Sequence, residues 1–156
     1  MNLISESAGD AKEKISDIVW SISPENDDWE IFLSKCRRYA SDLLESSDIK
    51  YELKIAESIS GKLDMNSRQH LWMIFKEMLT NVVRHSKAER VDLIMDTEDD
   101  VFKIILQDDG IGFDPEQYSY GNGLKNIHKR AESIGATLIL DSEPSVGTRW
   151  RLEIKI

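Results

Sequence analysis

The chain has 156 residues, 29 of them acidic and 20 basic, so its formal net charge is −9 at pH 7. This length suffices for one domain with a hydrophobic core, and the acidic excess argues against a nucleic-acid-binding protein, which would present a basic surface. A single cysteine, Cys36, cannot form an internal disulfide and fits a reducing compartment. The sequence shows neither an apolar run long enough to span a membrane nor the pattern of a signal peptide.

Residues 3–22 are predicted to form a helix with one apolar seam. The seam alternates steps of four and three, as the a and d positions of a coiled coil do, through Ile4, Ala8, Ala11, Ile15, Ile18 and Ile22. Such a helix has no partner helix of the same kind in its own sequence. We therefore expect the seam to pair with another chain or with a segment outside this sequence. The alternative is that it packs on the domain that follows.

Residues 23–28 are predicted to end this helix and to mark a domain boundary, which separates a helical segment, 1–23, from a domain of residues 24–156. Pro24 disfavours helix at the residue before it, and the acidic run after it is typical of a turn. A second helix is predicted for residues 29–44. Apolar and charged residues alternate over 48–57, which predicts a half-buried strand.

The segment 67–86 is predicted to be a helix with two distinct faces. At about 100° per residue, one broad apolar arc carries Leu71, Phe75, Met78, Leu79 and Val82. A second arc, with i, i+4 steps, carries Glu77, Asn81, Arg84 and His85. Taken alone, the second arc is typical of an ordinary solvated face. Its carboxylate, amide, guanidinium and imidazole groups could also bind a metal ion and phosphate.

The remainder of the chain is predicted to alternate strands with one helix. The predicted elements are strands at 90–96 and 101–107 with a polar turn at 97–100, a mobile loop at 114–122, a helix at 123–134 that Gly135 ends, and strands at 136–141 and 148–156. Together with the preceding elements they predict an α/β fold, a two-layer sandwich with a mostly antiparallel sheet.

Three glycine-containing motifs follow the two-faced helix. Asp108-Asp109-Gly110-Ile111-Gly112 comes directly after a predicted strand. A carboxylate there can accept a hydrogen bond from an exocyclic amine such as that of adenine, and the glycines allow a sharp turn and the close approach of a flat ligand. Gly121-Asn122-Gly123-Leu124 opens a helix, where exposed N–H groups can bind an anion. Gly147-Thr148 begins the last strand. Each motif alone is also typical of an ordinary turn.

In this order, the motifs resemble the N, G1, G2 and G3 boxes of the GHKL ATP-binding superfamily. They are Glu77-x-x-x-Asn81, Asp108-x-Gly110-x-Gly112, Gly121-x-Gly123-Leu124 and Gly147-Thr148, within a resemblance that covers roughly residues 24–156. There is no P-loop motif. Within the superfamily, Asn81-Val82-Val83-Arg84-His85-Ser86 and residues 121–127 are similar to bacterial sensor histidine kinases of the NarX and DesK type. Residues 18–24 are similar to the end of the second dimerisation helix in such kinases.

The resemblance implies the Bergerat fold and the ATP-binding catalytic domain of a two-component sensor histidine kinase. Such a domain would transfer the γ-phosphoryl of ATP to a histidine outside this chain, for relay to a response regulator. By the resemblance, Glu77 would be catalytic and lie near the transferred phosphate, Asn81 would hold Mg²⁺, and Asp108 would bind the adenine amine with support from Thr148. The other implied ATP-binding residues are Arg84, His85, Gly110, Gly112, Gly121, Gly123 and Leu124.

The chain departs from the family pattern in two respects. An F box is hard to find between Gly112 and Gly121, and no phosphoacceptor histidine is found, because His70, His85 and His128 all lie inside the ATP-binding region. We therefore expect a fragment whose partners are ATP, the dimerisation and phosphoacceptor domain of the same kinase, and a response regulator. The full-length protein is expected to be a homodimer anchored in the inner membrane, with this domain in the cytoplasm.

Two other functions were considered. One is a serine kinase like the anti-sigma factors of the same superfamily, which would lack a coiled-coil leader, so the seam in residues 4–22 argues against it. The other is a nucleotide-sensing interaction module without turnover. Glu77, Asn81 and Asp108 are all present, which argues against this loss of catalysis.

Overall fold

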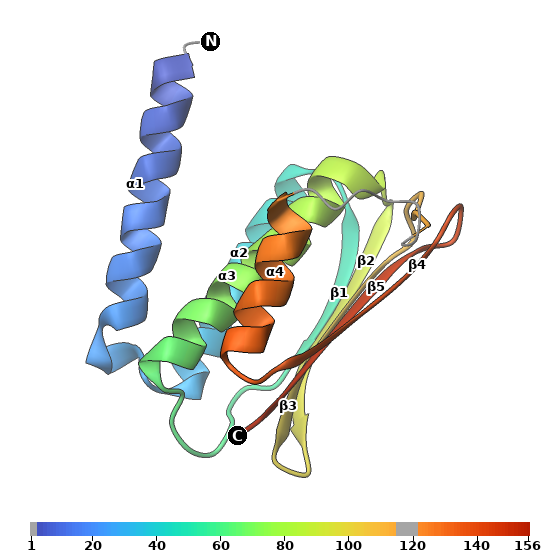
Figure 1. Cartoon of the computed structure of the whole chain (residues 1–156). Helices are drawn as coiled ribbons and strands as arrows, with labels where there is room; N and C mark the ends of the chain where they lie inside the picture. The colour runs from blue at the N-terminus through green and yellow to red at the C-terminus, as the bar shows by residue number, and fades with distance from the viewer. Residues whose placement is uncertain (1–2, 115–121) are drawn as a thin grey trace.

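In the computed structural model of the chain, which describes residues 3–114 and 122–156, five strands form one sheet with helices on one of its faces (Figure 1). The elements are α1 (Leu3–Ile22), a short 3₁₀ helix (Pro24–Asn26), α2 (Trp29–Ser46), β1 (Lys50–Ile55), α3 (Met65–Asn81), a π-helix (Val82–Ser86), β2 (Arg90–Glu98), β3 (Val101–Asp108), α4 (Asn122–Ser133), β4 (Thr137–Glu143) and β5 (Gly147–Lys155). The predicted α/β sandwich is confirmed.

The strand order is β1-β2-β3-β5-β4, in which only the β1–β2 pair is parallel. A parallel pair needs a long crossover, and α3 supplies it. The β2–β3 pair needs only a tight turn. Asp99 and Asp100 adopt positive φ values of 51° and 61° there, as the two central residues of a hairpin turn of this hand do. The observed turn is therefore shorter than the predicted turn at 97–100, because β2 extends to Glu98.

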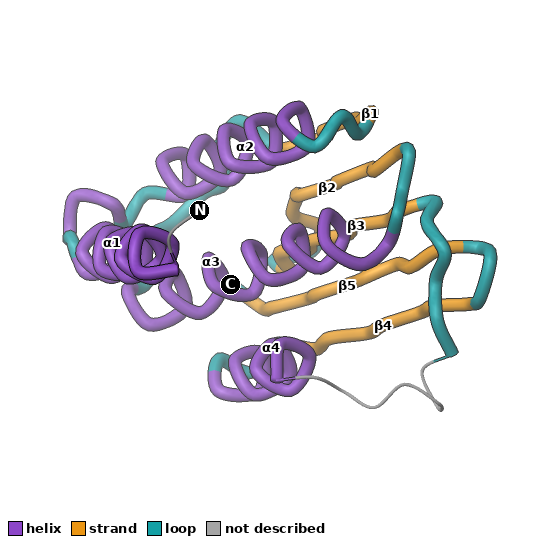
Figure 2. Tube along the Cα trace, turned by 90° about the horizontal axis from the view of Figure 1, so that it is seen from above, coloured by secondary structure: helices purple, strands orange, loops and turns teal. Residues whose placement is uncertain are grey.

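The hydrophobic core lies between the sheet and the layer formed by α2, α3 and α4 (Figures 1 and 2). Alternate residues of the central strands are buried against the helices, as the period of two requires: Val91, Leu93, Met95, Phe102, Ile104, Leu106, Trp150, Leu152 and Ile154. The predicted apolar arc of α3 is buried at every position, at Leu71, Phe75, Met78, Leu79 and Val82. This packing fixes the rotation of α3 about its axis, and hence the direction of its polar arc.

The central helix differs from its prediction at both ends. It begins at Met65, because the Asp64 side chain caps it by accepting a hydrogen bond of 2.9 Å from the backbone N–H of Ser67. After Asn81 the helix widens into the π-helix Val82–Ser86. The spacing of 100° per residue therefore fails beyond Asn81. The other predicted elements that follow α1 differ from the observed bounds by two residues or fewer.

Helix α1 stands at one end of the helical layer and contacts α3 (Figure 2). Three isoleucines of its seam do not face the domain: Ile15, Ile18 and Ile22 are 62%, 51% and 50% exposed. Asp17 and Ser21, on the opposite side, are buried instead. For these isoleucines, the alternative in which the seam packs on the domain is wrong, and pairing with another chain stays a prediction.

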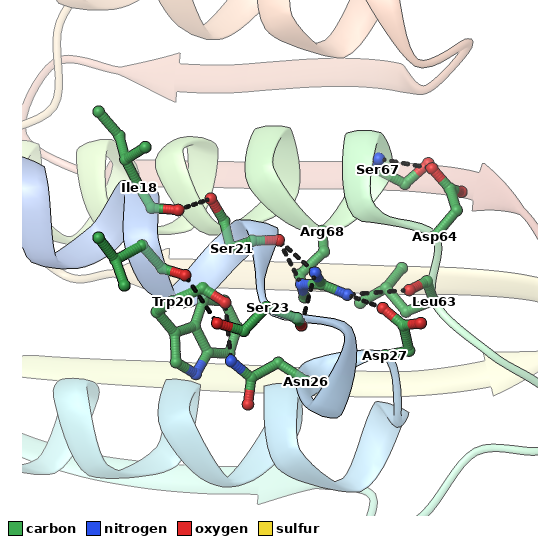
Figure 3. A network of polar contacts seen from close by, with 11 residues as sticks. Ile18, Trp20, Ser21, Ser23, Asn26, Asp27, Leu63, Asp64, Ser67 and Arg68 are labelled. Atoms are coloured by element: carbon green, nitrogen blue, oxygen red, sulfur yellow. Dashed lines mark hydrogen bonds and ion pairs between the residues drawn. The ribbon is translucent and has the colours of Figure 1, made fainter.

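Polar contacts join the C-terminal half of α1 to α3. The fully buried Arg68 donates hydrogen bonds to the carbonyl oxygens of Ser21 and Ser23 and forms an ion pair of 2.5 Å with Asp27 (Figure 3). Two turns beyond Arg68 on α3, the Nζ atom of Lys76 lies 2.6 Å from a carboxylate oxygen of Asp17. The predicted helix break at residues 23–28 is confirmed, since a 3₁₀ turn follows α1. The domain boundary placed there stays a prediction.

Candidate functional site

A pocket of about 310 Å³ lies between the C-terminal end of α3, the π-helix, the start of α4 and the adjoining ends of β3 and β5. This volume is in the usual range of small-molecule sites. It is lined by Glu77, Asn81, Val82, Arg84, His85, Ser86, Asp108, Ile111, Gly112, Phe113, Gly123, Leu124, Thr148 and Trp150. Residues from four separate predicted motifs therefore meet in one cavity.

Asp108 supplies a buried carboxylate to this cavity. It is the last residue of β3 and is 4% exposed. The backbone N–H of Gly110 donates to its Oδ1 at 2.8 Å. Burial raises the pKa of Asp108, and backbone hydrogen bonds from Gly110 and Thr148 oppose that rise. The carboxylate is thus a desolvated acceptor in a fixed orientation, which suits the selective binding of an N–H donor.

Three glycines permit the backbone packing around Asp108. A Cβ atom at Gly110 would overlap the carbonyl oxygen of Ser86, and one at Gly147 would overlap that of Asp108. Gly112, with φ +58°, leaves no room for a Cβ beside the carbonyl oxygen of Glu143. The close approach that these glycines permit is between parts of the protein's own backbone, and the approach of a flat ligand at Gly110 and Gly112 stays a prediction. Of the two glycines in the Asp108 motif, Gly110 and Gly112, only Gly112 also lines the pocket.

Ser142 connects three parts of this region and was not identified from the sequence. Its hydroxyl accepts a hydrogen bond of 2.9 Å from the N–H of Phe113 and lies 2.8 Å from the Thr148 hydroxyl. It also lies 3.2 Å from the carbonyl oxygen of Gly147. Ser142 and Thr148 are partners across β4 and β5. The contact between the two hydroxyls depends on this strand register, which could not be predicted from the sequence.

The other end of the pocket carries the polar arc of α3. Glu77 and Asn81 are half-buried in the last two turns of the helix, whereas Arg84 and His85 are exposed on the π-helix. All four line the pocket, as predicted. The wider turn, and not a continuous α-helical face, brings the last two there. Lys87, with φ 53°, ends the π-helix in a left-handed conformation.

Helix α4 begins beside Glu77. A Cβ atom at Gly123 would meet the tip of the Glu77 side chain, so the start of α4 lies directly against this carboxylate. Leu124 is buried below this point. The N-terminus of a helix of twelve residues offers unpaired N–H groups and a positive dipole end to an anion. Gly121 and almost all of the predicted mobile loop 114–122 lie outside the described residues, so their roles stay predictions.

Apolar residues that the sequence analysis did not assign to the site complete the pocket wall. They are Val82, Ile111, Phe113 and Trp150. Strand alternation could have placed Trp150 on the same face as Thr148, since both belong to the helix-facing set of β5. Ile111 and Phe113 occupy the positions beside the glycines of the Asp108 motif. A flat ring next to the Asp108 carboxylate would contact these side chains.

The donors at the Glu77 end fit a magnesium ion bound together with phosphate. Among the described residues, no cluster of three or more His, Cys, Asp or Glu side chains could hold a metal ion. Asn81 and Glu77 provide one amide oxygen and one carboxylate to the pocket. Mg²⁺ in phosphate-transfer sites uses few protein oxygens and completes its shell with substrate phosphates and water. The donor set therefore fits Mg²⁺ that enters with a nucleotide.

Comparison with known families agrees with this geometry. Residues 66–156 match the family described as histidine kinase-, DNA gyrase B-, and HSP90-like ATPase. The chain belongs to this ATPase family. It is 34% identical over 116 residues to the sensor protein VraS of Staphylococcus aureus (strain COL), and 35% identical over 118 residues to VraS of Staphylococcus saprophyticus. Each alignment covers 73% of this chain and 33% of the relative, so the chain spans about one third of the length of these sensor proteins.

Solved structures show the same fold. The Acinetobacter baumannii histidine kinase AdeS aligns over 97% of this chain and 79% of its own, with a TM-score of 0.68 at 17% identity. The histidine kinase domain of the Erythrobacter litoralis EL346 blue-light activated kinase aligns over 83% and 64%, with a TM-score of 0.69 at 18% identity. The ATPase-family fold is therefore that of histidine kinase catalytic domains. Within the described residues, no helix of this family member has the length and apolarity needed to cross a membrane.

Proposed function

We propose that the chain binds ATP with Mg²⁺ in this pocket and transfers the γ-phosphoryl group to a histidine of another domain. The main support is the buried Asp108 carboxylate in the same cavity as the polar end of α3. One end of the pocket offers a selective acceptor for a base amine, and the other offers groups suited to phosphate and metal. A ligand with a base at one end and phosphates at the other satisfies both.

Different residues would bind the base and the phosphates of ATP. Asp108 accepts a hydrogen bond from the adenine amine in a dry site, where an unpaired group is costly. Arg84 and His85 offer N–H donors to phosphate oxygens, and the guanidinium of Arg84 can bind two oxygens at once. The N-terminus of α4 adds backbone N–H groups. These local donors offset the repulsion between a triphosphate and an acidic chain.

Phosphoryl transfer needs positioning and electrostatic stabilisation more than covalent chemistry from the protein. Asn81 would hold the metal by its amide oxygen, and Mg²⁺ supplies charge neutralisation at the phosphates when it is bound. Glu77, one turn earlier on α3, would orient the acceptor imidazole or hold its proton. Gly123 at the start of α4 lies beside the Glu77 carboxylate, so the two elements would form one wall of the reaction site.

The acceptor and its domain are further parts of the proposal. The names of the VraS relatives support a sensor kinase rather than a serine kinase of the anti-sigma type. The exposed Ile15, Ile18 and Ile22 would pack in the dimerisation bundle of the full-length protein, which would relay the phosphoryl group to a response regulator. We further propose that the full-length protein is a homodimer anchored in a membrane, with this domain in the cytoplasm.

Incubation with γ-labelled ATP and Mg²⁺ tests the transfer. The chain alone should bind ATP without acquiring acid-labile label. A purified histidine-containing dimerisation domain of a sensor kinase should become labelled when it is added, and the same domain with its histidine changed to glutamine should not. Acid-labile label on the chain alone would contradict the proposal. Acid-stable label on serine would indicate the serine kinase, and binding without any transfer would indicate the sensing module.

A further inference from the structure

The Ser86 side chain closes the π-helix that carries Arg84 and His85. Ser86 is the last residue of this helix and is 7% exposed. Its hydroxyl donates a hydrogen bond of 2.6 Å to the carbonyl oxygen of Val82 and accepts one of 3.1 Å from the backbone N–H of Ala88. A carbonyl oxygen can only accept and a backbone N–H can only donate, so the direction of both bonds is fixed.

This pair of hydrogen bonds spans the whole π-helix. In a π-helix a backbone N–H bonds to the carbonyl oxygen five residues earlier, whereas an α-helix uses a step of four. The Ser86 hydroxyl reaches back four residues, so it gives the Val82 carbonyl a partner at the step that the wider turn does not use. On its other side it holds the N–H of Ala88, which follows the left-handed Lys87. The hydroxyl thus joins the start of the π-helix to the chain that leaves it.

The backbone of Ser86 has a separate contact with the base end of the pocket. Its carbonyl oxygen accepts a hydrogen bond of 2.7 Å from the N–H of Ile111, and a Cβ atom at Gly110 would overlap the same oxygen. The hydroxyl, in contrast, bonds within the π-helix and to the residue two positions beyond it. A change of the side chain can therefore test the π-helix without removing the carbonyl oxygen that packs against the Asp108 motif.

We propose that Ser86 is a positioning residue that directs Arg84 and His85 toward the phosphates of a nucleotide by holding the π-helix in its wide form. The proposal rests on the function proposed above and deepens it by assigning a support to the phosphate contacts. Both side chains are exposed and line the pocket, so their direction depends on the backbone that carries them. A regular α-helical turn would point them elsewhere, because each residue there advances by about 100°, a larger angle than in the wider turn.

Competition binding of adenosine and of a nonhydrolysable ATP analogue, each against a fluorescent ADP analogue with Mg²⁺ present, tests the proposal. Ser86→Ala should weaken binding of the ATP analogue by about threefold to tenfold, as expected for the loss of one hydrogen bond, and should leave adenosine binding unchanged. Ser86→Thr keeps a hydroxyl that can bond to the same carbonyl oxygen, so it should retain the parent ratio of the two affinities. If Ser86→Ala weakened both ligands equally, or neither of them, the proposal would be overturned.

Thr80→Ala is the matched control. The Thr80 hydroxyl also donates to a carbonyl oxygen four residues earlier, that of Lys76, but it does so in the regular part of α3, and Thr80 does not line the pocket. The ratio of the two affinities should therefore keep its parent value in this variant. A ratio lowered as much as in Ser86→Ala would contradict a role that depends on the π-helix.

A variant that combines Arg84→Ala with His85→Ala shows whether Ser86 acts through these two side chains. In that background, Ser86→Ala should not change the affinity ratio any further. A further loss of the same size would mean that Ser86 acts independently, which contradicts the proposal. Circular dichroism of each variant confirms that it is folded. If the parent chain binds neither ligand, the proposed ATP function fails as well, whereas normal binding with an unaltered ratio in Ser86→Ala rejects only the role of Ser86.

Discussion

The two ends of the pocket are built in different ways. At the base end, Asp108 and Thr148 are buried and held by backbone and hydroxyl hydrogen bonds, on strands of the central sheet. At the phosphate end, Arg84 and His85 are exposed and lie on a π-helix that follows α3. In the proposed function, the base would meet buried groups that the sheet holds in place. The phosphates would meet long, exposed side chains that can adjust when a ligand arrives.

The largest effect should come from filling the backbone packing at the base end. Gly112→Ala should lower the free energy of unfolding by about 3 kcal/mol, because a Cβ atom would overlap the carbonyl oxygen of Glu143 at a positive φ. Gly135→Ala is the matched control, since Gly135 also has a positive φ but no atom within 4 Å of the added carbon. It should cost only about 1 kcal/mol. Equal losses in urea denaturation would contradict the tight packing of this end.

Asp108→Ala should have the next largest effect, on affinity. Loss of the one carboxylate that meets the base amine should weaken ATP binding by about 1–3 kcal/mol, the cost of an unpaired buried polar group. Isothermal titration calorimetry on the folded variant measures this loss. Asp141→Ala serves as control, because Asp141 is exposed on β4. Unchanged affinity in the first variant would mean that the base does not bind at this end.

Asn81→Ala should separate the two ends by their dependence on metal. With Mg²⁺ present, ATP affinity should fall by about 1 kcal/mol, the usual worth of one polar contact. In excess EDTA the variant and the parent should bind alike, whereas Asp108→Ala should weaken binding under both conditions. The same titrations with and without metal give the comparison. A loss that is independent of Mg²⁺ would show that Asn81 supports the helix instead of the metal.

The smallest effect concerns pH. Burial raises the pKa of Asp108 above its ordinary value of 3.8, so the folded state holds a proton that the unfolded chain releases at lower pH. This stabilising contribution is present below the unfolded pKa and is lost as pH rises through the folded pKa. Asp108→Asn removes the titration. The variant should therefore gain stability relative to the parent as pH rises above 3.8, while it binds ATP more weakly. If the free energy of unfolding depended on pH in the same way in both proteins, burial would not disfavour the charged form of Asp108.

Local patterns in the sequence predicted most of the fold. The apolar arc of α3 and the alternation in β2, β3 and β5 depend on periodicity alone, and burial follows that periodicity. The motif residues of the pocket, among them Glu77, Asp108 and Thr148, were predicted because their spacing resembles that of a known superfamily. Their meeting in one cavity agrees with that prediction.

Features that depend on contacts between distant residues could not be predicted. The π-helix after Asn81 is one such feature, because its sequence also suits a continued α-helix. Another is the contact between Ser142 and Thr148, which only the strand register brings together. Arg68 would be assigned to the surface from its charge, yet it is fully buried against the end of α1. These polar contacts and the ring of Trp20 against Trp72, and not the apolar seam, join that helix to α3.

The parallel pairing of β1 with β2 has a consequence for the order of folding. The β2–β3 and β4–β5 hairpins can form from contacts between neighbours in sequence, whereas β1 meets β2 only across the whole of residues 56–89. Loop closure over such a distance carries an entropic cost and slows the step. Because α3 lies inside that loop, the wall bearing Glu77 and Asn81 should reach its final position together with β1. We therefore expect refolding chains to recover the sheet's hairpins before they recover the ability to bind nucleotide.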